Sequence, residues 1–251
     1  MSLYFEEIIK KGGAWKDARV IGNQLLLLGD CVEIMSCLPV VDGVLTDPPY
    51  GISQDKGFIG VKEREVKGRG TKIPSRRYEG GWDKERPSPC VFHKIRNISK
   101  KQIIWGGQFF ADILPAQGKW LFWDKCMTMP SFSDGELAWT NLDGVSIKKF
   151  TYNGNGLMAK EKDRVHPTQK PLALMEWCLS FLPKEQTILD PFMGSGTTLV
   201  ACQRLGKLGI GIELDENYFE IACRRVKQEY DNPPLFAIEL APTPPEQQSF
   251  L

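Results

Sequence analysis

Histidine is scarce in this sequence: the 251 residues include only two, His93 and His166. Neither stands at metal-ligand spacing from a cysteine, and no CxxC pair occurs. The seven cysteines are Cys31, Cys37, Cys90, Cys126, Cys178, Cys202 and Cys223. Their scatter predicts no metal site and indicates buried free thiols in a reducing compartment.

Long apolar runs are also absent. No stretch approaches the roughly 18 apolar residues of a membrane span, and the first residues do not join a basic start to an apolar run, as a signal peptide does. We therefore expect a cytoplasmic protein with no membrane partner. At 251 residues, of which 42% are hydrophobic, the chain is long enough for one domain with a sizeable core.

A strong net charge is lacking as well, since the formal value is +1, but the charge is unevenly distributed. Residues 56–101 contain fourteen Lys or Arg against five Asp or Glu, whereas residues 211–251 contain three against eight. The basic segment suggests contact with a polyanion such as nucleic acid. Residues 51–89 are also long and aperiodic, so we expect a mobile basic loop there; a solvated loop with no binding role is the alternative.

Strand and helix patterns alternate along much of the chain. Strands are predicted at 25–28, 40–46, 102–105, 120–123, 187–189 and 208–212, and helices at 31–38, 91–100, 172–181, 199–205 and 215–226. This alternation predicts an α/β fold with a doubly wound, mainly parallel, Rossmann-like sheet. Ligands bind such sheets at the carboxyl ends of the strands. Four acidic residues follow predicted strands and should share that rim: Asp30, Asp47, Asp190 and Glu213.

One candidate ligand loop is Asp190–Thr198, which reads DPFMGSGTT. Its glycines let the backbone approach a ligand at a strand-to-helix turn. The loop lacks the lysine of a phosphate-binding P-loop and does not match GxGxxG. Glu213, at the end of the next strand, could accept both hydroxyls of a ribose. Together these features favour a nucleoside-bearing cofactor without phosphates, such as S-adenosylmethionine; a tight packing turn is the alternative.

The second candidate loop is Asp47-Pro48-Pro49-Tyr50, where two prolines end a strand. An exocyclic amine on a base is a poor nucleophile because its lone pair is delocalised into the ring. Hydrogen bonds from the amine to the Asp47 carboxylate and the Pro48 carbonyl would draw the nitrogen toward tetrahedral geometry. Tyr50 offers a face on which an extruded base can stack. Positioning and electrostatics would then supply the rate.

Six motifs in this order resemble the amino-group DNA methyltransferases, specifically the permuted beta class, in which the DPPY motif precedes the glycine loop. They are Leu28–Cys31, Thr46–Gly51, Ile104–Gly107, His166–Pro171, Asp190–Thr198 and Gly211–Asp215. The resemblance implies methyl transfer from S-adenosylmethionine to an exocyclic amino group of double-stranded DNA. An aspartate at the head of the loop favours N6 of adenine, and cytosine N4 is the alternative.

The resemblance also implies roles for single residues. Asp47, Pro48, Pro49 and Tyr50 would be catalytic. The cofactor would be held by Asp30, Cys31, Lys170, Asp190, Phe192, Gly194, Ser195, Gly196, Thr197 and Glu213, with Asp30 and the Cys31 backbone at its adenine and Glu213 at its ribose. His166 is expected to make a hydrogen bond at a helix entry.

Target recognition would lie in a small insert, with residues 126–165 as the candidate. Trp139 and Tyr152, together with Trp82 of the basic loop, are candidates for DNA contact, although aromatic residues of this kind are more often part of the core. The sequence leaves a homodimer open. It also leaves open an RNA or protein methyltransferase, which the permuted order disfavours. A silent DNA-binding module is disfavoured because Asp47 and the glycines are intact.

Overall fold

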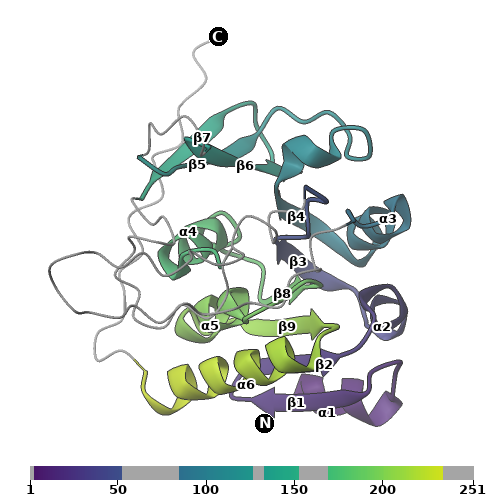
Figure 1. The fold of residues 1–251 in the computed structure, drawn as a ribbon. Helices are drawn as coiled ribbons and strands as arrows, with labels where there is room; N and C mark the ends of the chain where they lie inside the picture. Colours follow the sequence, from purple (N-terminus) through teal and green to yellow (C-terminus); the bar gives the residue numbers. More distant parts are fainter. Residues whose placement is uncertain (1–2, 53–84, 127–132, 153–168, 234–251) are drawn as a thin grey trace, which may run out of the picture.

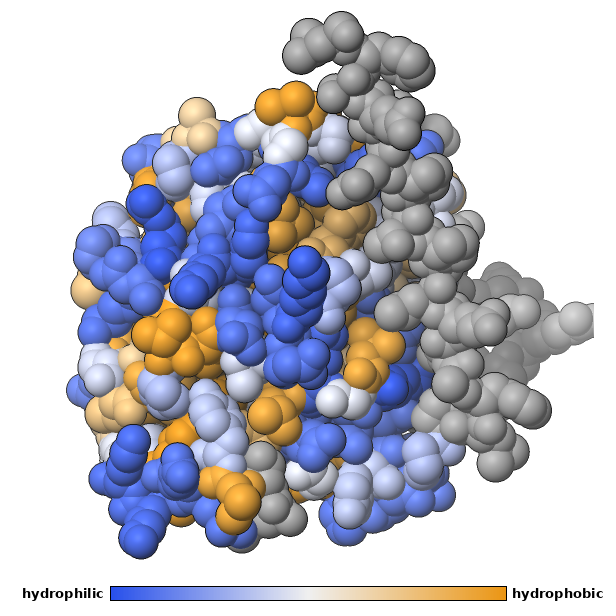
Figure 2. All heavy atoms as spheres, turned by 180° about the vertical axis from the view of Figure 1, so that it is seen from behind, coloured by the Kyte–Doolittle hydropathy of each residue, from blue (hydrophilic) through white to orange (hydrophobic). Residues whose placement is uncertain are grey.

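The computed structural model describes residues 3–52, 85–126, 133–152 and 169–233. Within these ranges, no helix has the length and apolar character needed to cross a membrane. On the face shown in Figure 2, hydrophilic side chains predominate and hydrophobic ones form separate small groups. The apolar residues are instead collected in the interior, on both faces of one large sheet.

Nine strands form this sheet, in the order β1-β2-β9-β8-β3-β4-β6-β5-β7. They are β1 (Asp17–Ile21), β2 (Gln24–Leu28), β3 (Val41–Thr46), β4 (Ser99–Trp105), β5 (Trp120–Asp124), β6 (Gly135–Thr140), β7 (Ile147–Thr151), β8 (Thr187–Asp190) and β9 (Leu208–Glu213). The five strands from β2 to β4 are parallel. On one side of this group β1 pairs antiparallel with β2, and on the other side β6 pairs antiparallel with β4. The expected mainly parallel α/β sheet is therefore confirmed.

Helices cover both faces of the sheet. They are α1 (Leu3–Lys11), α2 (Cys31–Cys37), α3 (Pro89–Ile98), α4 (Leu172–Ser180), α5 (Thr197–Arg204) and α6 (Glu216–Asp231), and a short 3₁₀ turn, η2, spans Gly107–Phe110. Figure 1 shows α4, α5 and α6 along one side of the sheet, and α3, α2 and α1 along the other. The fold is thus doubly wound.

The four leucines of β2 show why this strand is buried on both faces of the sheet. Leu25 and Leu27 pack into the core with α1, α2 and α3. Leu26 and Leu28 point to the opposite face and pack with α5 and α6. Because side chains alternate along a strand, a continuous apolar run suits a strand that is covered on both faces.

Neighbouring parallel strands bring the candidate loops together. β2, β9, β8 and β3 are adjacent, so their carboxyl ends place Asp30, Glu213, Asp190 and Asp47 in that order along one rim, as expected. The residue after β2 is tied to the end of β9, since Gly29 donates its backbone N–H to the Glu213 carbonyl oxygen at 2.8 Å.

Several details differ from the sequence-based expectations. α1 and β1 were not predicted, α6 extends five residues beyond Val226, and Pro171 is the N-cap of α4 rather than a residue of its first turn. Burial of the cysteines holds for Cys178, Cys202 and Cys223, whereas Cys37, Cys90 and Cys126 are exposed and Cys31 is partly buried.

The two segments expected to contact DNA are described only in part. Of the basic loop, residues 53–84 lie outside the described residues. Of the expected insert, residues 133–152 contribute β6 and β7 to the main sheet instead of a separate lobe. Trp139 lies on β6 with 2% exposure, so the interpretation as a core residue is confirmed and Trp139 is excluded as a DNA contact.

Candidate active site

The first part of the site is the DPPY loop, Asp47–Tyr50, which leaves the carboxyl end of β3. Thr46, the last residue of β3, is fully buried and donates from Oγ1 to the Asp190 carboxylate at 2.7 Å. Prolines at 48 and 49 cannot donate to a strand ladder, so β3 ends here. The loop thus starts from a point that is fixed to the neighbouring strand β8.

The ring of Tyr50 is fixed by packing. It stacks on Phe109, with ring centroids 4.9 Å apart, and meets the edge of Phe110 at 6.2 Å. Gly106 lies beneath the ring with φ of +69°, and a Cβ there would come within 2.1 Å of it. This contact explains the glycine of the Ile104–Gly107 motif: only a residue without a side chain leaves room for Tyr50.

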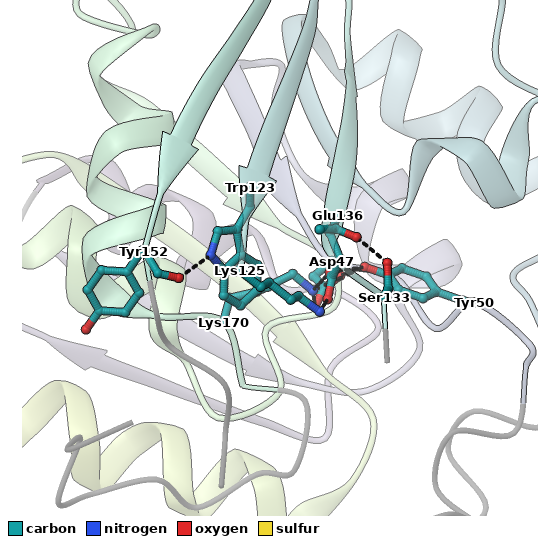
Figure 3. A network of polar contacts seen from close by, with 9 residues as sticks. Asp47, Tyr50, Trp123, Lys125, Ser133, Glu136, Tyr152 and Lys170 are labelled. Atoms are coloured by element: carbon teal, nitrogen blue, oxygen red, sulfur yellow. Dashed lines mark hydrogen bonds and ion pairs between the residues drawn. The ribbon is translucent and has the colours of Figure 1, made fainter. Parts of the chain in front are cut away.

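Tyr50 joins a charge cluster, which we define as Asp47, Tyr50, Lys125, Glu136 and Lys170. Tyr50 Oη donates to Asp47 Oδ1 at 2.6 Å, and Lys170 Nζ donates to Asp47 Oδ2 at 2.6 Å. Lys170 Nζ also lies 3.0 Å from Glu136 Oε2, which is part of β6. Lys125, just after β5, pairs with the other oxygen of Glu136. Figure 3 shows these side chains converging from separate segments of the chain.

Burial and pairing act against each other in this cluster. Burial raises the pKa of the Asp47 carboxyl, although the Lys170 ammonium opposes it. Burial also disfavours ionised Glu136, but Lys170 and Lys125 prevail and lower its pKa to about 2. For Lys170, burial is outweighed by the two carboxylates, which raise its pKa. Asp47 is thus the carboxylate of the cluster that burial shifts toward the neutral form, and its side chain is 22% exposed against 6% for Lys170, so an incoming group can reach it more easily.

The second part of the site is the glycine loop, Asp190–Thr198, between β8 and α5. Asp190 is 3% exposed and is used internally. Its carboxylate accepts from Thr46 Oγ1, from the Phe192 backbone N–H and from Thr198 Oγ1. Burial raises its pKa to about 6, against these hydrogen bonds. Asp190 therefore ties the glycine loop to the DPPY loop, and its expected cofactor contact stays a prediction.

The two glycines of the loop have different surroundings. Gly194 has φ of +51°, and a Cβ there would meet nothing within 4 Å. Gly196 has φ of +79°, and a Cβ there would lie 3.0 Å from Ala222 of α6. Gly194 thus opens onto free space that a ligand can enter, whereas Gly196 allows α6 to pack closely.

Arg225 of α6 holds the loop from behind. Its NH1 donates to the Ser195 carbonyl oxygen at 2.6 Å, to Ser195 Oγ at 2.8 Å and to Thr197 Oγ1 at 3.1 Å. Ser195 Oγ also donates to Gln169 at 3.3 Å. Ser195 and Thr197, both expected to line the cofactor site, therefore have their hydroxyls engaged within the protein.

Acidic residues flank the loop at the ends of β9 and β2. Glu213 accepts backbone N–H groups from Gly194, Leu214 and Asp215 at 2.8 to 2.9 Å. Burial raises its pKa to about 7, although these hydrogen bonds oppose the shift. Asp30 is exposed and caps α2 through Oδ1, which accepts the N–H groups of Val32 and Glu33. This capping role was predicted.

Three further expected residues are described: Cys31, Phe192 and Lys170. Cys31 starts α2 and is partly buried, and burial raises its thiol pKa to about 12, so it is no nucleophile at neutral pH. Phe192 is partly buried against the core. Lys170 was expected near the cofactor; its observed partners are Asp47, Tyr50 and Glu136, and a cofactor contact stays a prediction. His166 lies outside the described residues.

Sequence reasoning missed Glu136, Lys125 and Arg225. A signal for Glu136 was present, since it stands in the otherwise apolar stretch Gly135–Trp139 of a buried strand. A charged residue in such a place usually has a partner. For Arg225 there was no such signal, because its surroundings on α6 are rich in charge.

Known proteins are similar to this chain. The family model for DNA methylases matches residues 99–224, half of the chain. The Type II methyltransferase M.HinfI of Haemophilus influenzae is 25% identical over 272 residues, which cover 86% of this chain and 73% of that protein. The Type II methyltransferase M2.DpnII of Streptococcus pneumoniae is 49% identical over 152 residues, which cover 59% of this chain and 50% of that protein.

A solved structure is also similar to this chain. The crystal structure of the M1.HpyAVI–SAM complex has a TM-score of 0.51 and 26% identity, covering 80% of this chain and 98% of that one. The doubly wound sheet with its two rim loops defines a Rossmann-like methyltransferase. The chain belongs to the DNA methylase family whose members act on N6 and N4 amino groups.

Proposed function

We propose that this chain transfers a methyl group from S-adenosylmethionine to the N6 amino group of adenine in double-stranded DNA. The observation that carries the proposal is the position of Asp47. Its carboxylate lies at the end of β3 and is partly exposed. The neighbouring strand β8 leads into the glycine loop, which has open space beside Gly194. A hydrogen-bond acceptor for an amine and a place for a cofactor are thus adjacent.

The residues around Gly194 fit the cofactor. The open space at Gly194 admits a ligand close to the backbone, and no phosphate-binding lysine stands in the loop. Glu213 would accept the ribose hydroxyls, while Asp30 and the Cys31 backbone would hold the adenine ring. Phe192 would line the methionine portion. When bound, S-adenosylmethionine supplies a methyl group on a sulfonium, which an amine can attack directly.

The chain's own contribution is to orient the amine. Asp47 and the Pro48 carbonyl would each accept a hydrogen bond from one N–H of the amine, which turns the nitrogen lone pair toward the methyl group. Pro49 stiffens the loop, and Tyr50 would contact a base that has left the helix. Burial strengthens the hydrogen bonds to Asp47, because a low-dielectric site screens them less than water does.

Adenine is favoured over cytosine by the aspartate that heads the loop. The same geometry can also orient the N4 amine of cytosine, so that base is the second candidate. A homodimer stays a prediction, and sedimentation of the protein with and without DNA would test it.

The test is to incubate the protein with labelled S-adenosylmethionine and plasmid DNA, digest the DNA to nucleosides and identify the labelled one. We expect N6-methyladenine. N4-methylcytosine would replace the adenine assignment, and unlabelled DNA would overturn the proposal. Asp47→Ala should raise the activation free energy of methyl transfer by about 2.7–4 kcal/mol, by analogy with oxyanion-hole donors. Cofactor affinity, measured by calorimetry, should be unchanged.

A further inference from the structure

The hydrogen bonds of Asp47 pose a problem for an incoming base. Both carboxylate oxygens are engaged, Oδ1 by the Tyr50 hydroxyl and Oδ2 by the Lys170 ammonium, each at 2.6 Å. An amino group that binds Asp47 must share an oxygen with one of these donors or displace it. Of the two, the ammonium is the stronger competitor because it carries a full charge.

Lys170 has a second carboxylate within reach, that of Glu136. An ammonium group has three donors, and Lys170 Nζ lies within reach of three acceptors: Asp47 Oδ2 at 2.6 Å, Glu136 Oε2 at 3.0 Å and Tyr50 Oη at 3.1 Å. The side chain is 6% exposed. A buried ammonium without a carboxylate is strongly disfavoured, so Glu136 is what makes release of Asp47 feasible.

We propose that Lys170 is a displaceable counter-ion, which binds Asp47 while no base is present and passes to Glu136 when the amino group of the target base takes its place. Lys170 and Glu136 are then positioning residues for the methyl transfer. This inference rests on the proposed function, since it assigns a role within the same site.

Charge balance supports this exchange. The cluster contains two carboxylates, Asp47 and Glu136, and two ammonium groups, Lys125 and Lys170, so its charges cancel when all four are ionised. Lys125 stays with Glu136, which keeps that carboxylate in place to receive Lys170. Once Lys170 has moved away, Asp47 is a more basic acceptor, as the amine requires at the moment of transfer.

The neighbouring titratable groups are few among the described residues. Lys170 faces Asp47 and Tyr50 from the DPPY loop, Glu136 from β6 and Cys178 from α4. Asp47 also faces Asp190 at the end of β8. Among the described residues, these groups therefore determine how a substitution nearby changes the charge of Asp47.

The test is the pH dependence of single-turnover methylation at saturating cofactor and DNA. In Glu136→Gln, Lys170 keeps Asp47 as its only carboxylate, and a like charge near Asp47 is removed. Both changes favour ionised Asp47, so the acid limb of the profile should move to lower pH. The plateau rate should fall about tenfold to a hundredfold, since the amine now competes with a fully committed ammonium.

Lys170→Gln should move the same limb in the opposite direction, to higher pH, because Asp47 loses its counter-ion. Lys125→Gln should also move the acid limb to higher pH, because Glu136, having lost Lys125, then draws Lys170 away from Asp47. If Glu136→Gln does not fold, Lys125→Gln and Lys170→Gln test the proposal in its place. Glu176→Gln is the matched control. It removes the carboxylate that pairs with Arg204 and leaves the charge cluster untouched, so the acid limb should stay unchanged.

Limbs that coincide with the wild type, or that move in the same direction in Glu136→Gln and Lys170→Gln, would overturn the inference and leave the proposed function standing. A wild-type protein that does not methylate DNA would instead contradict the proposed function itself.

Discussion

At the scale of single residues, Gly106 controls Tyr50 without touching any substrate. Gly106→Ala would place a Cβ 2.1 Å from the Tyr50 ring, so the ring must leave its place on Phe109. We expect methyl transfer to fall about a hundredfold, as a misplaced group near the reacting atoms can cause, while calorimetry shows cofactor binding retained. Gly12→Ala is the control: its φ of +72° gives the same backbone strain, with nothing within 4 Å. Equal activity in both variants would contradict the role of Gly106.

Glu213 leads to a prediction about pH. Its pKa is raised from 4.5 to about 7, so the folded protein holds a proton there that the unfolded chain has released. Between these two values the stability of the cofactor-free protein should therefore fall as pH rises, and Asp190, with its pKa raised to about 6, should add to the effect.

Cofactor affinity should show the reverse dependence, because the ribose hydroxyls donate to ionised Glu213. Calorimetric titrations should give weaker binding as pH falls below about 7, and Glu213→Ala should bind weakly with no step in that range. If the affinity of Glu213→Ala fell by the same factor over this pH range, the titrating group would be a residue other than Glu213.

At the scale of elements, the two glycines of the loop between β8 and α5 should respond differently to alanine. Both alanines would be strained at positive φ, by about 1–2 kcal/mol. Gly194→Ala fills open space, so its main effect should be lost cofactor affinity. Gly196→Ala also crowds Ala222 of α6, so it should lower the melting temperature further. Melting curves without cofactor, together with binding isotherms, separate the two; the same stability loss in both variants would contradict the distinction.

Local chemistry explains which elements could be predicted. The leucine run of β2, the Asp30 cap of α2 and the Pro48–Pro49 end of β3 each carry their signal within a few residues, and each was predicted within one or two residues. β1 has no burial alternation, since all five residues are partly buried, which left it unrecognised.

Long-range contacts explain what could not be predicted. Glu136 and Lys170 are 34 residues apart in the chain and meet only because β6 pairs with β4. The placement of β6 depends on the whole sheet, and no local pattern reports it. The acidic residues of the rim were easier to place, because any residue that ends a parallel strand lies on the same rim.

At the scale of the whole molecule, DNA binding should depend on the basic segment that precedes α3. Arg69, Lys72, Arg76 and Arg77 lie outside the described residues, so their role rests on sequence. Neutralising all four should weaken binding to every DNA sequence alike and flatten the dependence of affinity on salt, because fewer counterions are released. Titrations at several salt concentrations would show this. An unchanged slope would mean a solvated segment, and lost discrimination between sites with the slope preserved would make it a base reader.

The attachment of β6 to β4 has a consequence for how such an enzyme can acquire a new target site during evolution. Glu136 reaches Lys170 because β6 is paired with β4 in one particular alignment. A single inserted or deleted residue that shifted this alignment would turn Glu136 to the opposite face of the sheet and bring a neighbour into its place. Apart from Lys125, which pairs with Glu136, the stretch between β5 and β6 should therefore tolerate changes of residue type, whereas a change in its length should be tolerated only where the strand alignment is restored.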